Sequence, residues 1–318
     1  MKRDLLVIGG ATQRMLDRFA ENFTIHRAAK IDDLAVYLAE HGHRFEAVAT
    51  TGFDGISPEV MDALPSLRII SCYGVGYDAI DAVTAASRGI VVTHTPNVLN
   101  AEVADTAILL MLAVSRRLIR DDRWVRSGNW KAKGPAPLTR TVEGRRVGIL
   151  GLGRIGETIA EKLKAFDCEV VYHSRNERPD VEWRYYIDLV AMARDVDFLV
   201  VITPGGAATR KLVNREVIDA LGPQGTLINV ARGSVVDEAE LVSALRDGRL
   251  GNAGLDVFEN EPEVPEALFG MDNVVLLPHV GSATVETRQA MGDLTVDNLN
   301  AYFADGRAIS PVPECADL

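Results

Sequence analysis

The sequence predicts an α/β protein with two doubly wound parallel-sheet domains. Its 318 residues, 47% of them hydrophobic, are enough for about two domains with sizeable cores. Short apolar runs rich in β-branched residues alternate with longer helical patterns, which is typical of parallel strands buried on both faces by helices. The alternation forms two series, separated by a proline-containing break at residues 93–97 that would suit a hinge.

The first series covers about the first 95 residues. Its expected strands are residues 5–8, 47–50, 67–72 and 90–93. The clearest helical patterns between them are residues 31–40 and 78–87. This series predicts the first α/β unit.

A long helix is expected next, over residues 101–126, and because residues 107–114 are apolar all round, its middle should be buried on most sides. The second series then gives strands at residues 146–150, 169–172, 198–202, 225–230 and 274–277. A last helical pattern over residues 285–304 leads into a proline-containing tail.

Composition narrows the class of protein. The chain has 34 Lys and Arg against 45 Asp and Glu, a net charge of −11 that argues against nucleic acid or a membrane surface as a partner. Cys72, Cys168 and Cys315 form no Cys-x-x-Cys pair, and the six histidines form no ligand-spaced cluster, so we expect neither disulfides nor a metal. Without a targeting pattern or an apolar run near the roughly 20 residues that span a bilayer, a cytoplasmic location is predicted.

A glycine motif points to a nucleotide. Gly151, Gly153 and Gly156 have the Gly-x-Gly-x-x-Gly spacing, directly after the strand that ends at residue 150 and at the start of a helical pattern. The first glycine permits the turn, the second lets backbone approach a pyrophosphate, and the third allows the helix to pack closely on the strand. This context predicts a Rossmann-type dinucleotide site that includes Arg154 and Ile155; the alternative is a tight turn with no ligand.

The end of the next strand indicates which dinucleotide. NAD-binding units place an acid there, about 20 residues on, to bind the ribose hydroxyls. Here His173 is followed by Ser174 and Arg175, and no carboxylate comes before Glu177. A hydroxyl and a guanidinium suit a 2′-phosphate, so NADPH is the predicted cofactor. The alternative is that Arg175 is only a solvated loop arginine.

Three polar residues follow later strands or strand ends. Arg232, Glu261 and His279 should all lie near the carboxyl edge of the sheet, where ligands of doubly wound folds bind. Taken singly, each has an ordinary explanation, as a salt-bridge partner, a turn residue and a core histidine. Together they suit the reduction of a 2-oxo acid, because Arg232 can hold the carboxylate and polarise the carbonyl. Protonated His279 can protonate the alkoxide, and Glu261 can stabilise the imidazolium.

These motifs, over essentially the whole chain, resemble the D-isomer-specific 2-hydroxyacid dehydrogenase family. The resemblance rests on residues 151–156, 229–233, 254–262 and 278–284. It implies catalytic roles for Arg232, Glu261 and His279. It also implies a flavodoxin-like substrate-binding domain from residues 1–98 and 286–318, with the dinucleotide-binding domain and a dimerisation arm, residues 99–285, inserted in it and the substrate in the cleft between them.

The resemblance implies further site residues. In the family, a loop like residues 73–78 holds the substrate carboxylate through backbone N–H groups, here those of Val75 and Gly76, although a simple glycine turn would read the same way. The cofactor would also contact Thr203, Pro204, Thr209, Val230, Ala231, Asp256 and Gly281. Within the family, Ser174-Arg175 and residues 203–206 resemble the branch of NADPH-dependent glyoxylate/hydroxypyruvate and hydroxyphenylpyruvate reductases.

A basic stretch runs against the acidic balance of the chain. Residues 116–146 hold ten Lys or Arg and three acids, with Trp124 and Trp130 among them. Such a segment could bind nucleic acid, but Trp and Arg are also enriched at subunit interfaces, and the family resemblance favours a dimerisation arm. We therefore expect a homodimer in which Trp130 either reaches the partner's substrate site or fills the interface core.

The leading interpretation is an NADPH-dependent reductase of small 2-oxo acids such as glyoxylate and hydroxypyruvate. A hydroxyphenylpyruvate or 2-ketogluconate reductase of the same family is the nearest alternative. A second alternative is a non-catalytic dinucleotide-sensing scaffold, which the absence of long disordered tails disfavours. A formate dehydrogenase or adenosylhomocysteine hydrolase would need a longer chain and another spacing of the polar residues.

Overall fold

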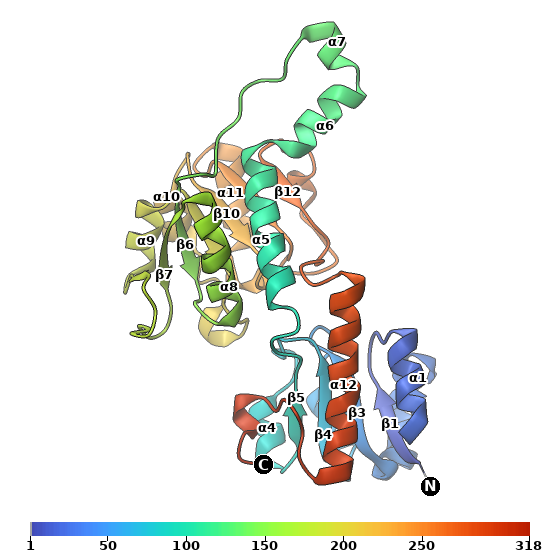
Figure 1. The fold of residues 1–318 in the computed structure, drawn as a ribbon. Helices are drawn as coiled ribbons and strands as arrows, with labels where there is room; N and C mark the ends of the chain where they lie inside the picture. The colour runs from blue at the N-terminus through green and yellow to red at the C-terminus, as the bar shows by residue number, and fades with distance from the viewer. Residues whose placement is uncertain (1) are drawn as a thin grey trace. The chain divides into compact units, whose positions relative to one another are not determined.

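The computed structural model describes residues 2–318 and divides into two compact units. The first unit runs to Leu99 and resumes at Ala283–Leu318, and the second is Asn100–Ser282. Each unit is an α/β layer structure around its own parallel sheet, as Figure 1 shows. The predicted fold class, with two parallel-sheet domains, is confirmed.

The sheet of the first unit has five parallel strands in the order β2-β1-β3-β4-β5. Its strands are β1 (Arg3–Val7), β2 (Phe23–Arg27), β3 (Phe45–Thr51), β4 (Ile69–Tyr73) and β5 (Val91–Thr93). This is the flavodoxin-like order, with the chain reversing direction across the sheet between β1 and β3. Strand β2 was not predicted, because it is a partly exposed edge strand and lacks the apolar run of its neighbours.

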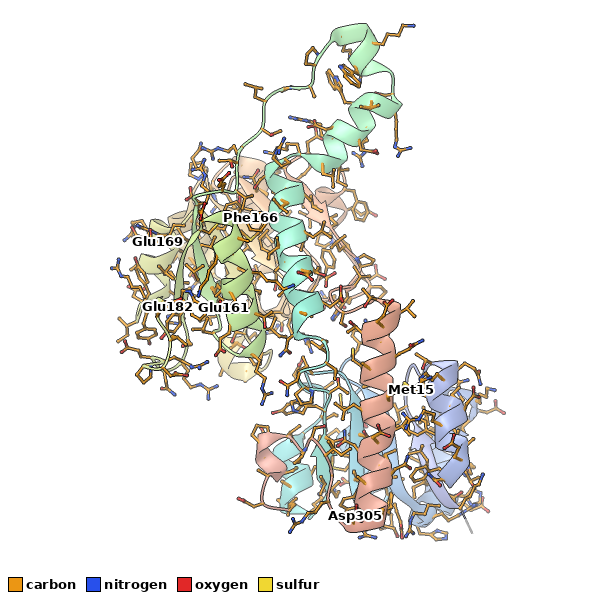
Figure 2. All side chains as sticks on the ribbon, in the orientation of Figure 1. Met15, Glu161, Phe166, Glu169, Glu182 and Asp305 are labelled. Carbon is orange, nitrogen blue, oxygen red and sulfur yellow. The ribbon has the colours of Figure 1, made fainter. Side chains whose placement is uncertain are left out.

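Helices cover both faces of this sheet. They are α1 (Gln13–Asn22), α2 (Leu34–His41), α3 (Pro58–Asp62), α4 (Ala82–Ser87) and, from the C-terminal end of the chain, α12 (Val285–Asp305). Helix α12 packs on β4 and beside α1, where Met15 (Figure 2) meets Gly292 so closely that a Cβ at Gly292 would lie 2.8 Å from its Cγ. Helix α12 therefore belongs to the first unit.

The sheet of the second unit has seven parallel strands in the order β12-β11-β10-β9-β6-β7-β8. They are β6 (Arg146–Leu150), β7 (Glu169–His173), β8 (Arg184–Tyr185), β9 (Phe198–Val201), β10 (Thr226–Asn229), β11 (Asn252–Leu255) and β12 (Val274–Leu276). From β8 to β11 this is the Rossmann strand order, extended by β12. The order reverses between β6 and β9, so a ligand site is expected where these two strands end.

The second unit carries the remaining helices. They are α5 (Asn100–Ser115), α6 (Leu118–Arg126), α7 (Asn129–Lys133), α8 (Arg154–Leu163), α9 (Leu189–Asp195), α10 (Arg215–Leu221) and α11 (Glu238–Asp247). Short 3₁₀ helices in the two units cover Ala28–Lys30, Gly42–Arg44, Lys164–Phe166, Ala207–Thr209, Gly233–Val235, Glu266–Leu268 and Pro313–Cys315. Within residues 2–318, no helix combines the length and the apolarity that a membrane crossing requires.

The single helix expected over residues 101–126 is wrong in one respect. The chain leaves the helical conformation at Arg117, whose φ of 51° is left-handed, so α5 ends before it and α6 begins after it. Helix α5 is buried against α8 and the sheet, as its apolar middle predicted. Helices α6 and α7 extend away from the sheet as an arm (Figure 1), which we define as residues 116–140.

Candidate functional site

The predicted residues of the second unit gather at one edge of its sheet. Because all seven strands are parallel, their carboxyl ends meet at the same edge. The loops after β6, β7, β9, β10, β11 and β12 carry, in that order, the glycine motif, Ser174 with Arg175, Thr203 with Pro204, Val230 to Arg232, Asp256 with Glu261, and His279 with Gly281.

Two of the three glycines of the motif are required by close backbone contacts. Gly151 has a φ of 105°, and a Cβ there would lie 2.8 Å from the backbone nitrogen of Thr203, so the turn after β6 touches the end of β9. At Gly156 a Cβ would lie 2.2 Å from the carbonyl oxygen of Gly151, so only glycine lets α8 pack against the turn. Around Gly153, in contrast, a Cβ would meet nothing within 4 Å.

This loop fits a dinucleotide. Gly153 caps α8 without a side-chain hydrogen bond, so no capping side chain occupies the first backbone N–H groups of the helix, at Arg154 and Ile155. Opposite, the loop after β9 is closed by the Thr209 hydroxyl, which donates to the Pro204 carbonyl at 2.7 Å. The arrangement suits an anionic pyrophosphate lying between the two loops.

Ser174 and Arg175 begin the loop after β7. The Ser174 hydroxyl donates to the carbonyl of Asn176 at 2.6 Å, and the Ser174 carbonyl accepts from the Tyr185 hydroxyl at 3.2 Å. Arg175 is exposed. The loop therefore has a fixed start and presents a guanidinium to solvent, as a 2′-phosphate site would require.

Arg232 is held by the turn in which it lies. Asn229, which is 1% exposed at the end of β10, accepts from the Ala231 N–H at 3.1 Å and donates to the Arg232 carbonyl at 3.0 Å. A Cβ at Gly233 would lie 1.9 Å from the carbonyl carbon of Phe258. The Arg232 turn therefore packs directly against the loop after β11, which carries Glu261.

Glu261 and His279 form a hydrogen-bonded pair. Nδ1 of His279 lies 2.7 Å from Oε2 of Glu261, and the Phe258 N–H donates to Oε1 at 3.0 Å. Since an ionised carboxylate can only accept, Nδ1 carries a proton, and Nε2 is the ring nitrogen left for proton transfer. The His279 side chain is 41% exposed, whereas that of Glu261 is 17% exposed.

The charge state of Glu261 follows from these contacts. Burial alone would favour the neutral acid, but the hydrogen bonds from His279 and the Phe258 N–H outweigh it and hold the pKa of Glu261 below its usual value. The positive charge of Arg232 lowers this pKa further. The structure thus brings the three predicted polar residues into one electrostatic group.

Asp256 has a use that the sequence did not reveal. The residue is 2% exposed, and its carboxylate accepts from the N–H groups of Val280 at 2.7 Å and Gly281 at 2.8 Å. Burial raises its pKa, and these two hydrogen bonds oppose that rise. The turn that they hold contains His279 at a left-handed φ of 54°. Asp256 therefore positions the residue that pairs with Glu261.

The loop of Val75 and Gly76 belongs to the first unit. Its carbonyl groups are engaged by the protein: Thr95 N–H donates to Gly74 at 2.9 Å, and Nδ1 of His94 lies 2.9 Å from the Val75 carbonyl. His94 was not among the predicted site residues, because its burial, with 9% of its surface exposed, is decided by the tertiary structure. The loop backbone is therefore fixed, as a carboxylate-binding loop requires.

Trp130 is not part of this edge within one chain. Gly281 accepts a hydrogen bond from Thr106 near the start of α5, whereas Trp130 lies on α7, beyond the other end of that helix. The 16 residues of α5 make it about 24 Å long. Trp130 is 62% exposed on the arm.

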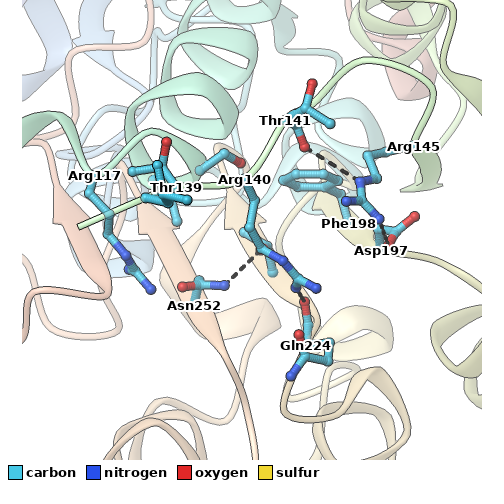
Figure 3. Close-up of a pocket in the computed structure, with 13 residues that line it drawn as sticks. Arg117, Thr139, Arg140, Thr141, Arg145, Asp197, Phe198, Gln224 and Asn252 are labelled. Atoms are coloured by element: carbon cyan, nitrogen blue, oxygen red, sulfur yellow. Dashed lines mark hydrogen bonds and ion pairs between the residues drawn. The ribbon is translucent and has the colours of Figure 1, made fainter.

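A pocket at the opposite edge of the same sheet contains none of the predicted site residues. It has a volume of about 110 Å³ and lies at the amino ends of β9, β10 and β11, among Arg117, Arg140 and Arg145 (Figure 3). Four of its lining positions belong to the arm: Arg117, Leu138, Thr139 and Arg140. The group of Arg232, Glu261 and His279 lies at the other end of the strands. Among residues 2–318, no group of three or more His, Cys, Asp or Glu could hold a metal.

Comparison with known proteins gives a consistent result. Residues 108–281 match the family model "D-isomer specific 2-hydroxyacid dehydrogenase, NAD binding domain". The chain is 52% identical to hydroxyphenylpyruvate reductase of Plectranthus scutellarioides, over 87% of this chain and 88% of that protein. It is 42% identical to 2-ketogluconate reductase of Gluconobacter oxydans, over 98% of this chain and 99% of that protein.

A solved structure is also similar along its whole length. The NADPH-dependent glyoxylate/hydroxypyruvate reductase of Sinorhizobium meliloti, determined with NADP and malonate, is 49% identical to this chain. Its TM-score is 0.94, with 99% of this chain and 98% of that chain covered.

Proposed function

Because the chain belongs to the D-isomer-specific 2-hydroxyacid dehydrogenase family of oxidoreductases, we propose that it is a cytoplasmic enzyme that reduces small 2-oxo acids to 2-hydroxy acids with NADPH. Glyoxylate and hydroxypyruvate are the proposed substrates, after the similar structure from Sinorhizobium meliloti. Hydroxyphenylpyruvate and 2-ketogluconate are the alternatives, after the two similar reductases. The observation that carries the proposal is the His279–Glu261 hydrogen bond beside Arg232, at the same sheet edge as the glycine loop.

The proposed mechanism divides the work among these groups. Arg232 binds the substrate carboxylate and polarises the 2-oxo group, with the backbone N–H groups of Val75 and Gly76 as further carboxylate donors. His279 gives the proton on Nε2 to the developing alkoxide, and Glu261 stabilises the imidazolium through Nδ1. NADPH, when bound at the glycine loop, supplies the hydride.

The function is tested by an oxidation assay. We expect the purified protein to consume NADPH with glyoxylate or hydroxypyruvate, and a panel that adds hydroxyphenylpyruvate and 2-ketogluconate ranks the substrates by kcat/KM. A protein that binds NADPH but turns over none of the four would instead favour the non-catalytic scaffold.

Cofactor choice should depend on the loop after β7. A lost charge-assisted hydrogen bond costs about 1.5–3 kcal/mol, so Arg175→Ala should weaken NADPH binding about 10- to 150-fold. NADH binding should barely change, because NADH has no 2′-phosphate. Titration of both nucleotides against the variant measures this, and equal losses would show that Arg175 does not read the 2′-phosphate.

The pH profile should report the pair at the catalytic edge. Since the pKa of Glu261 is lowered, its carboxylate is ionised at neutral pH and stabilises the protonated ring of His279. Reduction consumes that proton, so the rate falls as pH rises. Glu261→Gln removes the anion, and the alkaline limb of kcat/KM should move to lower pH, with NADPH affinity kept. A limb that stays in place would exclude Glu261 as the partner.

The arm supports the proposal of a homodimer. Five large apolar side chains of the arm are exposed, from 43% at Ile119 to 99% at Leu138, and partner subunits cover surfaces of this kind. The arm is folded rather than loose, since Trp124 Nε1 donates to the Gly134 carbonyl at 3.0 Å. We propose that the partner's cleft receives Trp130.

Light scattering on a sizing column should give a dimer for the wild type. Trp130→Ala should keep the dimer but change kcat/KM for a bulky 2-oxo acid relative to glyoxylate by several-fold. The matched variant Leu138→Ala, elsewhere on the arm, should loosen the dimer without changing that ratio. A monomeric wild type would refute both the assembly and the shared site; loss of the dimer in Trp130→Ala would make this tryptophan an interface residue only.

A further inference from the structure

The loop after β7 is fastened to the glycine loop by one arginine that the proposed chemistry does not use. Arg178 donates from Nη1 to the carbonyl of Leu152 at 3.1 Å, between the first two glycines of the motif. The same guanidinium pairs with Glu157 in the first turn of α8 and with Asp180 in its own loop. One side chain therefore bridges the loop that would hold the pyrophosphate and the loop that would hold the 2′-phosphate.

The backbone of Arg178 is fixed as well. Its N–H donates to the hydroxyl of Tyr172 at 2.8 Å, and that hydroxyl lies 3.3 Å from the Arg178 carbonyl. Tyr172 is fully buried in β7, so it is a rigid anchor. The loop that carries Ser174 and Arg175 is thereby held at both ends, by β7 and by Arg178.

The pairing with Glu157 has an electrostatic consequence. The N–H groups at the start of α8 attract an anion, but the carboxylate of Glu157 lies in the same turn and would repel a pyrophosphate. The Arg178 guanidinium pairs with this carboxylate and with that of Asp180, so its single positive charge offsets part of the repulsion. Hydrogen bonds to Asp180 and Glu157 raise the pKa of Arg178, so the compensating charge is permanent.

We propose that Arg178 is a positioning residue that couples the pyrophosphate loop to the 2′-phosphate loop and offsets the charge of Glu157, so that it supports the binding of both NADPH and NADH. This inference rests on the proposed function, since it concerns the same coenzyme site. It separates two neighbouring arginines by role: Arg175 distinguishes NADPH from NADH, whereas Arg178 serves the part that the two nucleotides share.

The test is coenzyme binding to the full-length protein, with Kd for NADPH and for NADH measured by fluorescence titration. Arg178→Ala should raise both Kd values by similar factors, about 10-fold or more for a lost charge-assisted contact. Arg178→Lys, which keeps the charge but not the fork of donors, should give a smaller rise in both. If the alanine variant does not fold, the Kd values of Arg178→Lys still test the inference. Arg194→Ala, an exposed arginine on α9, is the matched control and should change neither.

The specific readout is rescue. In Arg178→Ala/Glu157→Gln the repelling carboxylate is gone, so both affinities should recover by several-fold relative to Arg178→Ala, an effect that a general loss of stability would not produce. A loss confined to NADPH would overturn the inference and make Arg178 a direct 2′-phosphate ligand. Unchanged affinities, or no rescue, would also overturn it. A wild type that binds neither nucleotide would instead refute the proposed function, and the inference with it.

Discussion

The sheet edge of the second unit that carries the candidate site depends on the buried carboxylate of Asp256. It accepts two backbone N–H groups from the turn after β12, and each would cost about 1–3 kcal/mol if left unpaired in the interior. Gly281 approaches so closely that a Cβ would lie 2.9 Å from Oδ2. This tight turn is what holds His279 in a left-handed conformation and delivers its ring to Glu261. Asp256 thus sets the geometry of the His279–Glu261 pair without touching Glu261 itself.

Backbone contacts without intervening side chains organise the rest of the edge. Gly151 touches the end of β9, Gly156 touches the turn itself, and Gly233 touches the loop after β11. The first contact lies where the strand order reverses, between β6 and β9, so the space for a ligand opens there. Each of these positions would meet backbone if it carried a Cβ, and backbone cannot move aside as a side chain can.

The arm differs from the two sheet-containing cores in how its apolar side chains are placed. The cores of the units are closed by their own helices, whereas the arm contains few buried residues and turns apolar side chains outward. It also concentrates positive charge in a chain whose net charge is −11. Such a segment gains little by folding on its own chain, and a second subunit would supply the missing contacts.

The sequence by itself predicted the fold class and the glycine turn, because buried parallel strands are apolar runs and each motif is local. It also singled out Arg232, Glu261 and His279, which the structure brings together at one sheet edge. It could not give β2, an edge strand without such a run, or the break at Arg117, which no glycine or proline marks. Only the tertiary structure decided that Asp256 holds the turn at residues 279–281, that His94 holds Val75 and that Arg178 bridges two loops. These contacts join residues far apart in the chain or on different strands, and they exist only once the sheets have brought the loops together.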